Sequence, residues 1–371
     1  MNRNKLTGII LFSVFLAFLT ENPAVSQVIP VISADEFTRI SDSFSEAGGN
    51  FSNDNWVSNE TSYLEVLDKF IELDIHGGAY IGVGPNQNFT YIANIKPHIA
   101  FIVDIRRQNM LQHLIYKVLF EMADTRAEFF SILFSKPLSP NSGIDEDSNI
   151  SRMIYYFYRA PSDPGMFKKN LAKIENVLTE KYKYPLTDAD FSSLDRIFRT
   201  FFRLNLEITY NGNAYSWFPT YAQFLQIGDR NNNQRNPFNS REDFLFLKKM
   251  HAENRIIPVT GNFGGGKALK AVADYLQENH LKVTAFYVSN VEQYLLRDWN
   301  LWLKWGENVK NLPISSKTVF IRWTYQRSYW DDNSFGPRNT TRLQWMIDFI
   351  KNFDNNRYGS YSDLILIDYI K

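Results

Sequence analysis

The alternation of short apolar runs with helical segments constrains the fold of this chain most. Each run is about five to seven residues long and ends near a glycine or a polar residue, and a segment with helical spacing follows. Such runs are typical of strands buried on both faces of a parallel sheet. The sequence therefore predicts an α/β fold with a doubly wound, mainly parallel sheet. The predicted strands are 79–84, 99–104, 255–260, 282–288, 318–323 and 363–369, and the predicted helices include 87–95, 109–134, 267–279, 291–305 and 340–353.

A long segment without strand patterns interrupts this alternation. Residues 137–149 are rich in proline, serine and acids, which is typical of a loop or a subdomain boundary. The following residues have mostly helical spacing up to Asn254. We therefore expect N-terminal helices and the first βαβ unit in 27–136, a mainly helical insertion that acts as a cap or lid in 137–254, and the rest of the sheet in 255–371.

The first 26 residues have the pattern of a cleavable signal peptide. Arg3 and Lys5 precede an apolar run of about 14 residues, which is shorter than the roughly 20 that a membrane-spanning helix needs. Small residues at Ala24 and Ser26 then predict cleavage before Gln27. We expect export to the periplasm or the extracellular space, with retention as an uncleaved anchor as the alternative. No later run is long enough to predict a membrane span.

Composition excludes several kinds of site and partner. The chain has no cysteine, so disulfides, thiolate metal sites and a cysteine nucleophile are excluded. Lys plus Arg and Asp plus Glu both number 40, so no net charge attracts nucleic acid. The five histidines lack the spacing of known metal motifs, and no metal is expected. A small-molecule ligand is the expected partner, and the sequence does not indicate an oligomeric state.

A glycine pair at the end of the first predicted strand gives the strongest local indication of a site. Gly82 and Gly84 would let the backbone approach a ligand, and Asp104, at the end of the next strand, could bind a ribose. The structural alternative is that the glycines only form a tight turn, while Asp104 caps a helix or pairs with Arg106 or Arg107.

Two further predicted strands end in residues that could face the same ligand. Gly261-Asn262 opens a glycine-rich stretch that resembles a phosphate-binding loop, but Ala268 stands where that loop needs a hydroxyl. Asn290 and Glu292 follow the next strand and could orient a substrate amine or hydroxyl. The structural alternative is a capping box formed by Ser289 and Glu292.

The order of these strand ends resembles that of class I S-adenosylmethionine-dependent methyltransferases. The matching positions are Gly82-Val-Gly84, Asp104, Gly261-Asn262 and Ser289-Asn290. The resemblance implies a Rossmann-like fold, with the glycine loop under the methionine part of the cofactor, Asp104 on the ribose and Asn262 near the adenine. Four longer segments are similar to a group of uncharacterised bacterial proteins: Ser58–Tyr63, Gly77–Tyr91, Phe101–Arg107 and Phe286–Leu295.

Two functions agree with these observations. In the first, the chain is a methyltransferase-like enzyme that uses S-adenosylmethionine on an acceptor which the sequence does not name. Gly82, Gly84, Asn88, Asp104 and Asn262 then hold the cofactor, and Asn290 and Glu292 are the catalytic candidates. In the second, it is a non-catalytic protein outside the cytoplasm that uses a methyltransferase-like fold to bind another small molecule or a partner protein. Export favours the second function, because this cofactor is made in the cytoplasm.

Overall fold

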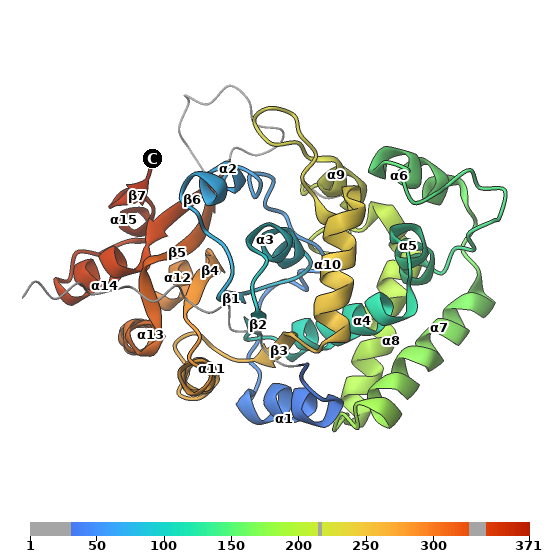
Figure 1. Cartoon of the computed structure of the whole chain (residues 1–371). Helices are drawn as coiled ribbons and strands as arrows, with labels where there is room; N and C mark the ends of the chain where they lie inside the picture. The colour runs from blue at the N-terminus through green and yellow to red at the C-terminus, as the bar shows by residue number, and fades with distance from the viewer. Residues whose placement is uncertain (1–30, 214–216, 326–338) are drawn as a thin grey trace, which may run out of the picture. The chain divides into compact units, whose positions relative to one another are not determined.

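In the described part of the chain, seven strands form one mixed sheet in the order β3-β2-β1-β4-β5-β6-β7 (Figure 1). The computed structural model describes residues 31–213, 217–325 and 339–371, and Val31–Lys371 forms one compact unit. The predicted signal peptide lies outside the described residues. The strands are β1 (Ala79–Gly82), β2 (Ile99–Asp104), β3 (Ile256–Thr260), β4 (Val283–Ser289), β5 (Ile314–Tyr325), β6 (Asn339–Trp345) and β7 (Tyr369–Ile370).

The first five strands are parallel, and β6 and β7 are each antiparallel to the preceding strand. β1, β2 and β3 are buried along their whole length, as their continuous apolar runs predict. The predicted α/β fold with a mostly parallel sheet is confirmed.

The C-terminal region differs from the prediction. The predicted helix 340–353 begins as β6, which pairs with β5 from Asn339 to Trp345, and only Met346–Asp354 is helical. The predicted strand 363–369 is mostly the helix Tyr361–Leu366. Its start is encoded locally, because Ser360 and Asp363 form a reciprocal capping box.

Two other predicted helices are each divided in two. The stretch 109–134 forms α4 and α5, and Thr125 caps the second of them through a capping box with Glu128. The stretch 291–305 forms α12 and α13, and the side chain of Asp298 caps the second. In both cases a side chain that accepts backbone hydrogen bonds starts a new helix within an otherwise continuous helical pattern.

The described α-helices are α1 (Ala34–Phe44), α2 (Leu67–Glu72), α3 (Gln87–Ile95), α4 (Arg107–Met122), α5 (Arg126–Phe134), α6 (Ile150–Arg159), α7 (Pro164–Asn176), α8 (Asp188–Leu204), α9 (Tyr221–Gln226), α10 (Arg241–Ala252), α11 (Ala268–Glu278), α12 (Glu292–Leu295), α13 (Trp299–Asn311), α14 (Met346–Asp354) and α15 (Tyr361–Leu366). A π-helical turn, Val177–Lys181, extends α7. No helix of the described residues is long and apolar enough to cross a membrane.

Helices pack against both faces of strand β4. Phe286 contacts Trp305 of α13, with ring centroids 5.5 Å apart, and the next residue, Tyr287, contacts Tyr91 of α3 at 5.1 Å. Because successive side chains of a strand point to opposite faces, α13 and α3 cover opposite sides of the sheet.

The chain between β2 and β3 contains α4 to α10. In Figure 1, α5 to α8 lie together, well away from β5 to β7. A cluster of phenylalanine rings joins α4, α5 and α10 with the segment that precedes α10. The cluster consists of Phe120, Phe129, Phe238 and Phe244. The chain contains 30 phenylalanines and 20 tyrosines, and these rings provide part of its large aromatic core.

Candidate functional site

A cavity of about 430 Å³ lies at the carboxyl ends of β1, β2, β3 and β4. Gly84, Asp104, Asn262 and Asn290 all line it, and each lies at or just after the end of one of these strands. The ends of neighbouring parallel strands lie at one edge of the sheet. The prediction that these four residues share an edge is therefore confirmed, and the volume is within the range of small-molecule sites.

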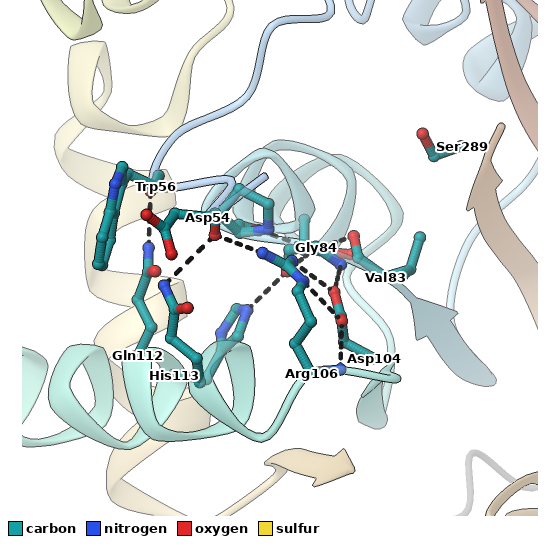
Figure 2. A network of polar contacts seen from close by, with 12 residues as sticks. Asp54, Trp56, Val83, Gly84, Asp104, Arg106, Gln112, His113 and Ser289 are labelled. Carbon is teal, nitrogen blue, oxygen red and sulfur yellow. Dashed lines mark hydrogen bonds and ion pairs between the residues drawn. The ribbon is translucent and has the colours of Figure 1, made fainter. Parts of the chain in front are cut away.

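Asp104 forms four hydrogen bonds within the protein (Figure 2). Its Oδ1 accepts from the backbone N–H of Arg106 at 2.8 Å and from the Nε of Arg106 at 3.1 Å. Its Oδ2 accepts from the N–H of Gly84 at 3.2 Å and from the Nη2 of Arg106 at 2.8 Å. These donors fill the usual acceptor sites of a carboxylate. Of the two structural alternatives for Asp104, the pair with Arg106 is present. The helix cap is not, because α4 begins at Arg107 and no side chain caps it.

Position 84 favours glycine because its φ is +76°, a value that other residues adopt only with strain. The Nε2 of His113 lies 2.9 Å from the carbonyl oxygen of Gly84. Burial lowers the pKa of His113 to about 4, so the ring is neutral and its Nε2–H donates to this carbonyl. Figure 2 shows His113 and Arg106 flanking Gly84.

Gly82 and Asn88 shape the loop after β1 but do not line the cavity. The Nδ2 of Asn88 donates to the carbonyls of Val83, Gly84 and Pro85 at 2.9, 3.1 and 2.7 Å. A Cβ at Gly82 would lie 1.9 Å from the Oδ1 of Asn88. Asn88 therefore holds the loop backbone from outside the cavity, and Gly82 leaves the space that the Asn88 side chain needs.

The glycine-rich loop after β3 surrounds an acid of the chain itself. The backbone N–H of Asn262 donates to the Oε1 of Glu46 at 2.7 Å, and a Cβ at Gly265 would lie 2.2 Å from the same atom. The carboxyl group of Glu46 therefore already occupies this part of the loop and takes a backbone donor that a phosphate would need.

Asn290 lines the cavity, but Glu292 does not. Glu292 is fully buried and pairs with Arg322, whose Nε lies 2.5 Å from its Oε2. It also accepts a hydrogen bond from the Nε1 of Trp305 at 3.0 Å. The predicted capping box is wrong, because Ser289 is the last residue of β4 and its hydroxyl donates to Glu60 instead. Glu292 is a structural residue.

The residue that sequence reasoning missed is Glu60. It lines the cavity with 3% of its surface exposed, and its Oε2 accepts from the Nε2 of Gln87 at 2.7 Å. Burial raises the pKa of Glu60 to about 7, although hydrogen bonds from Ser289, Gln87 and Tyr287 act in the opposite direction. Glu60 lies within Ser58–Tyr63, a segment that the resemblance marked without giving any of its residues a role. Only the fold shows which side chain of that segment enters the site.

Aromatic side chains form much of the cavity wall. Phe51 contacts Tyr294 with ring centroids 5.3 Å apart, and Trp323 contacts Tyr325 at 4.5 Å. Tyr210 also lines the wall. The described residues contain no group of three or more His, Cys, Asp or Glu side chains that could hold a metal ion. Rings with a few polar groups among them suit an organic ligand.

A family model described as "Domain of unknown function (DUF7790)" matches residues 55–137 and 145–367. The match includes Ser58–Tyr63 and every strand-end residue of the cavity. No curated protein matches the chain.

Proposed function

The chain belongs to the DUF7790 family, and we propose that it is a methyltransferase-like protein that binds S-adenosylmethionine in the cavity at the carboxyl edge of its sheet. The observation that carries the proposal is that Gly84, Asp104, Asn262 and Asn290 meet in one cavity. We propose that export, with cleavage before Gln27, precedes its action.

The strand order supports a doubly wound, Rossmann-like sheet. In the order β3-β2-β1-β4-β5 the direction of winding reverses between β1 and β4, and such a switch point is where open α/β sheets bind their ligands. The cavity lies at this point, because Gly84 follows β1 and Ser289 ends β4. The packing of α3 and α13 on opposite faces supports the same arrangement.

The bound nucleoside would lie along this edge. The loop at Gly84 would carry the methionine part, and Asn262 would lie near the base. Asp104 would bind the ribose hydroxyls after Arg106 releases part of the carboxylate. Arg106 has a second anchor that can keep it in place, since its Nη1 also donates to the carbonyl of Asp54.

The test is the binding of S-adenosylmethionine and S-adenosylhomocysteine by titration calorimetry to wild type, Asp104→Asn and Asp190→Asn. Asp190 is a matched control, because it is also a buried acid paired with an arginine, Arg107, but lies outside the cavity lining. Loss of a charge-assisted hydrogen bond, worth about 1.5–3 kcal/mol, should weaken binding to Asp104→Asn by roughly 10- to 150-fold. Asp190→Asn should bind as wild type does. Folded wild type that binds neither compound would refute the proposal.

A specific observation favours the second function, a non-catalytic binding protein. The four hydrogen bonds of Asp104 leave no acceptor site ready for a ribose. A ligand without a ribose would leave the pair between Asp104 and Arg106 intact. This function predicts that an organic ligand raises the melting temperature of wild type, while both adenosyl compounds leave it unchanged.

A further inference from the structure

Glu60 differs from the other buried acids in having no cationic partner. Four acidic residues of the described part are buried as whole residues, and three of them pair with an arginine: Asp104 with Arg106, Asp190 with Arg107, and Glu292 with Arg322. Glu60 forms no ion pair within 31–213, 217–325 or 339–371. Its hydrogen-bond partners, Ser289, Gln87 and Tyr287, are all neutral. Burying an unpaired carboxyl is unfavourable, so its position in a cavity wall points to a role in binding a ligand.

The local backbone holds Glu60 and Ser289 together at the end of β4. Ser289 has a φ of +51°, and the pairing of β4 with β5 shifts register between Tyr287 and Ser289. Such irregularities redirect a side chain at the end of a strand and are concentrated at functional sites. Here the hydroxyl of Ser289 donates to Glu60, while the Nε2 of Gln87, at the start of α3, donates to the other carboxyl oxygen.

Aromatic rings line the same cavity as the acid. Tyr210, Tyr287, Tyr294, Trp323 and Tyr325 contribute to the wall. The faces of such rings attract cations, and rings that surround a site are the usual means of binding an ammonium group. A single unpaired carboxylate adds the counter-charge. Among the described residues that line the cavity, only Arg106 carries a guanidinium group, and this group is already paired with Asp104.

We propose that the part of the cavity at Glu60 binds an organic cation, an ammonium group whose charge meets the Glu60 carboxylate and whose carbon substituents contact the aromatic wall. This site requires, as the proposed function does, that the cavity holds a ligand. It does not require that the ligand be an adenosyl compound. If the chain is a methyltransferase, the ammonium group is a charged part of a ligand that the site recognises, and a different atom receives the methyl group, because an ammonium nitrogen has no lone pair.

Binding of a cation should depend on pH, because it favours the charged form of Glu60. With a pKa of about 7, the free carboxyl is about one-tenth ionised at pH 6 and about nine-tenths at pH 8. The affinity of a permanent cation should therefore rise about tenfold over this range, with release of a proton below pH 7.

The titratable groups that surround Glu60 do not compete in this range. They are tyrosines, and burial, together with the charge of Glu60, raises the pKa of each above its usual value of about 10. These tyrosines are Tyr80 of β1, Tyr91 of α3, Tyr287 of β4, Tyr325 of β5, Tyr361 of α15, and Tyr210.

Choline and its uncharged isostere 3,3-dimethyl-1-butanol are the probes, measured by titration calorimetry at pH 8 with full-length protein. Wild type should bind choline more tightly than the alcohol. Glu60→Gln should weaken choline binding by at least about tenfold and change alcohol binding by less than about twofold. Glu72→Gln removes an exposed charge on α2 and should bind both probes as wild type does.

A second measurement does not depend on any variant. Choline titrations of wild type at pH 6, 7 and 8, in buffers with different ionisation enthalpies, should show the tenfold rise in affinity and the proton release. Absence of choline binding, equal binding by Glu60→Gln, or an affinity independent of pH would each overturn the cation site. If the cation site is overturned but adenosyl compounds still bind, the proposed function remains intact. If choline binds and adenosyl compounds do not, the cation site remains and the proposed function is refuted.

Discussion

Replacing Glu60 with glutamine should change the dependence of stability on pH. In the folded protein the pKa of Glu60 is about 7, raised from 4.5 by burial. A raised pKa means that the folded state holds this proton more tightly than the unfolded chain does. The associated stability is complete below pH 4.5, is lost as the pH rises to about 7, and stays lost above that.

The magnitude follows from the size of the shift. Each pKa unit corresponds to 1.36 kcal/mol, so the shift from 4.5 to about 7 amounts to roughly 3 kcal/mol. Glutamine is neutral at all of these pH values and has the shape of the protonated acid. Glu60→Gln should therefore change the free energy of unfolding little at pH 5 and raise it by up to about 3 kcal/mol at pH 8, relative to wild type.

Urea denaturation of both proteins at pH 5, 6, 7 and 8 measures this difference. A difference in the free energy of unfolding that is the same at every pH would come from the altered hydrogen bonds to Ser289 and Gln87. Only a change of this difference with pH tests the inference about the ionisation of Glu60. A difference that stays flat from pH 5 to pH 8, or one that falls, would refute the inference that burial without a cation dominates the ionisation of Glu60.

Three other outcomes are expected. Glu292→Gln leaves the buried guanidinium of Arg322 without its counter-charge and should lower the free energy of unfolding by about 3–5 kcal/mol; a loss below about 1 kcal/mol would contradict a structural ion pair. Gly84→Ala places a Cβ on a backbone with φ of +76° and should cost about 1–2 kcal/mol in the same assay, whereas an unchanged urea midpoint would mean that this turn carries no strain. N-terminal sequencing of the protein from fractionated cells should begin at Gln27, and a chain from the cytoplasm that begins at Met1 would refute export.

Local sequence determined the elements whose formation depends on their own periodicity. The continuous apolar runs of β1 to β4 predicted their positions to within a residue or two, because a strand buried on both faces must be apolar along its whole length. The glycines and polar residues at the ends of these strands also predicted the shared edge. Parallel connections bring successive strand ends to the same side of a sheet, and Gly84, Asp104, Asn262 and Asn290 consequently line one cavity.

Where two elements compete for the same residues, long-range pairing decided the outcome. The segment from Asn339 to Trp345 is a strand because β5 supplies its hydrogen-bond partners across the sheet. The capping box of Ser360 and Asp363 was visible in the sequence and would have placed α15 correctly. β7, with two residues, is a strand only through its pairing with β6.

The chemistry of the site depended most on tertiary structure. In the sequence, Glu60 and Glu292 are both acids near polar residues, and the second follows a predicted strand. The fold gives Glu292 a buried arginine as its partner, and leaves Glu60 beside neutral groups in a cavity wall. The ionisation of a carboxyl is set by the charges and the solvent within a few ångströms of it, and the residues that supply them here are distant in the sequence. Sequence determined which strand ends meet, and only the packed structure determined which acid is left unpaired there.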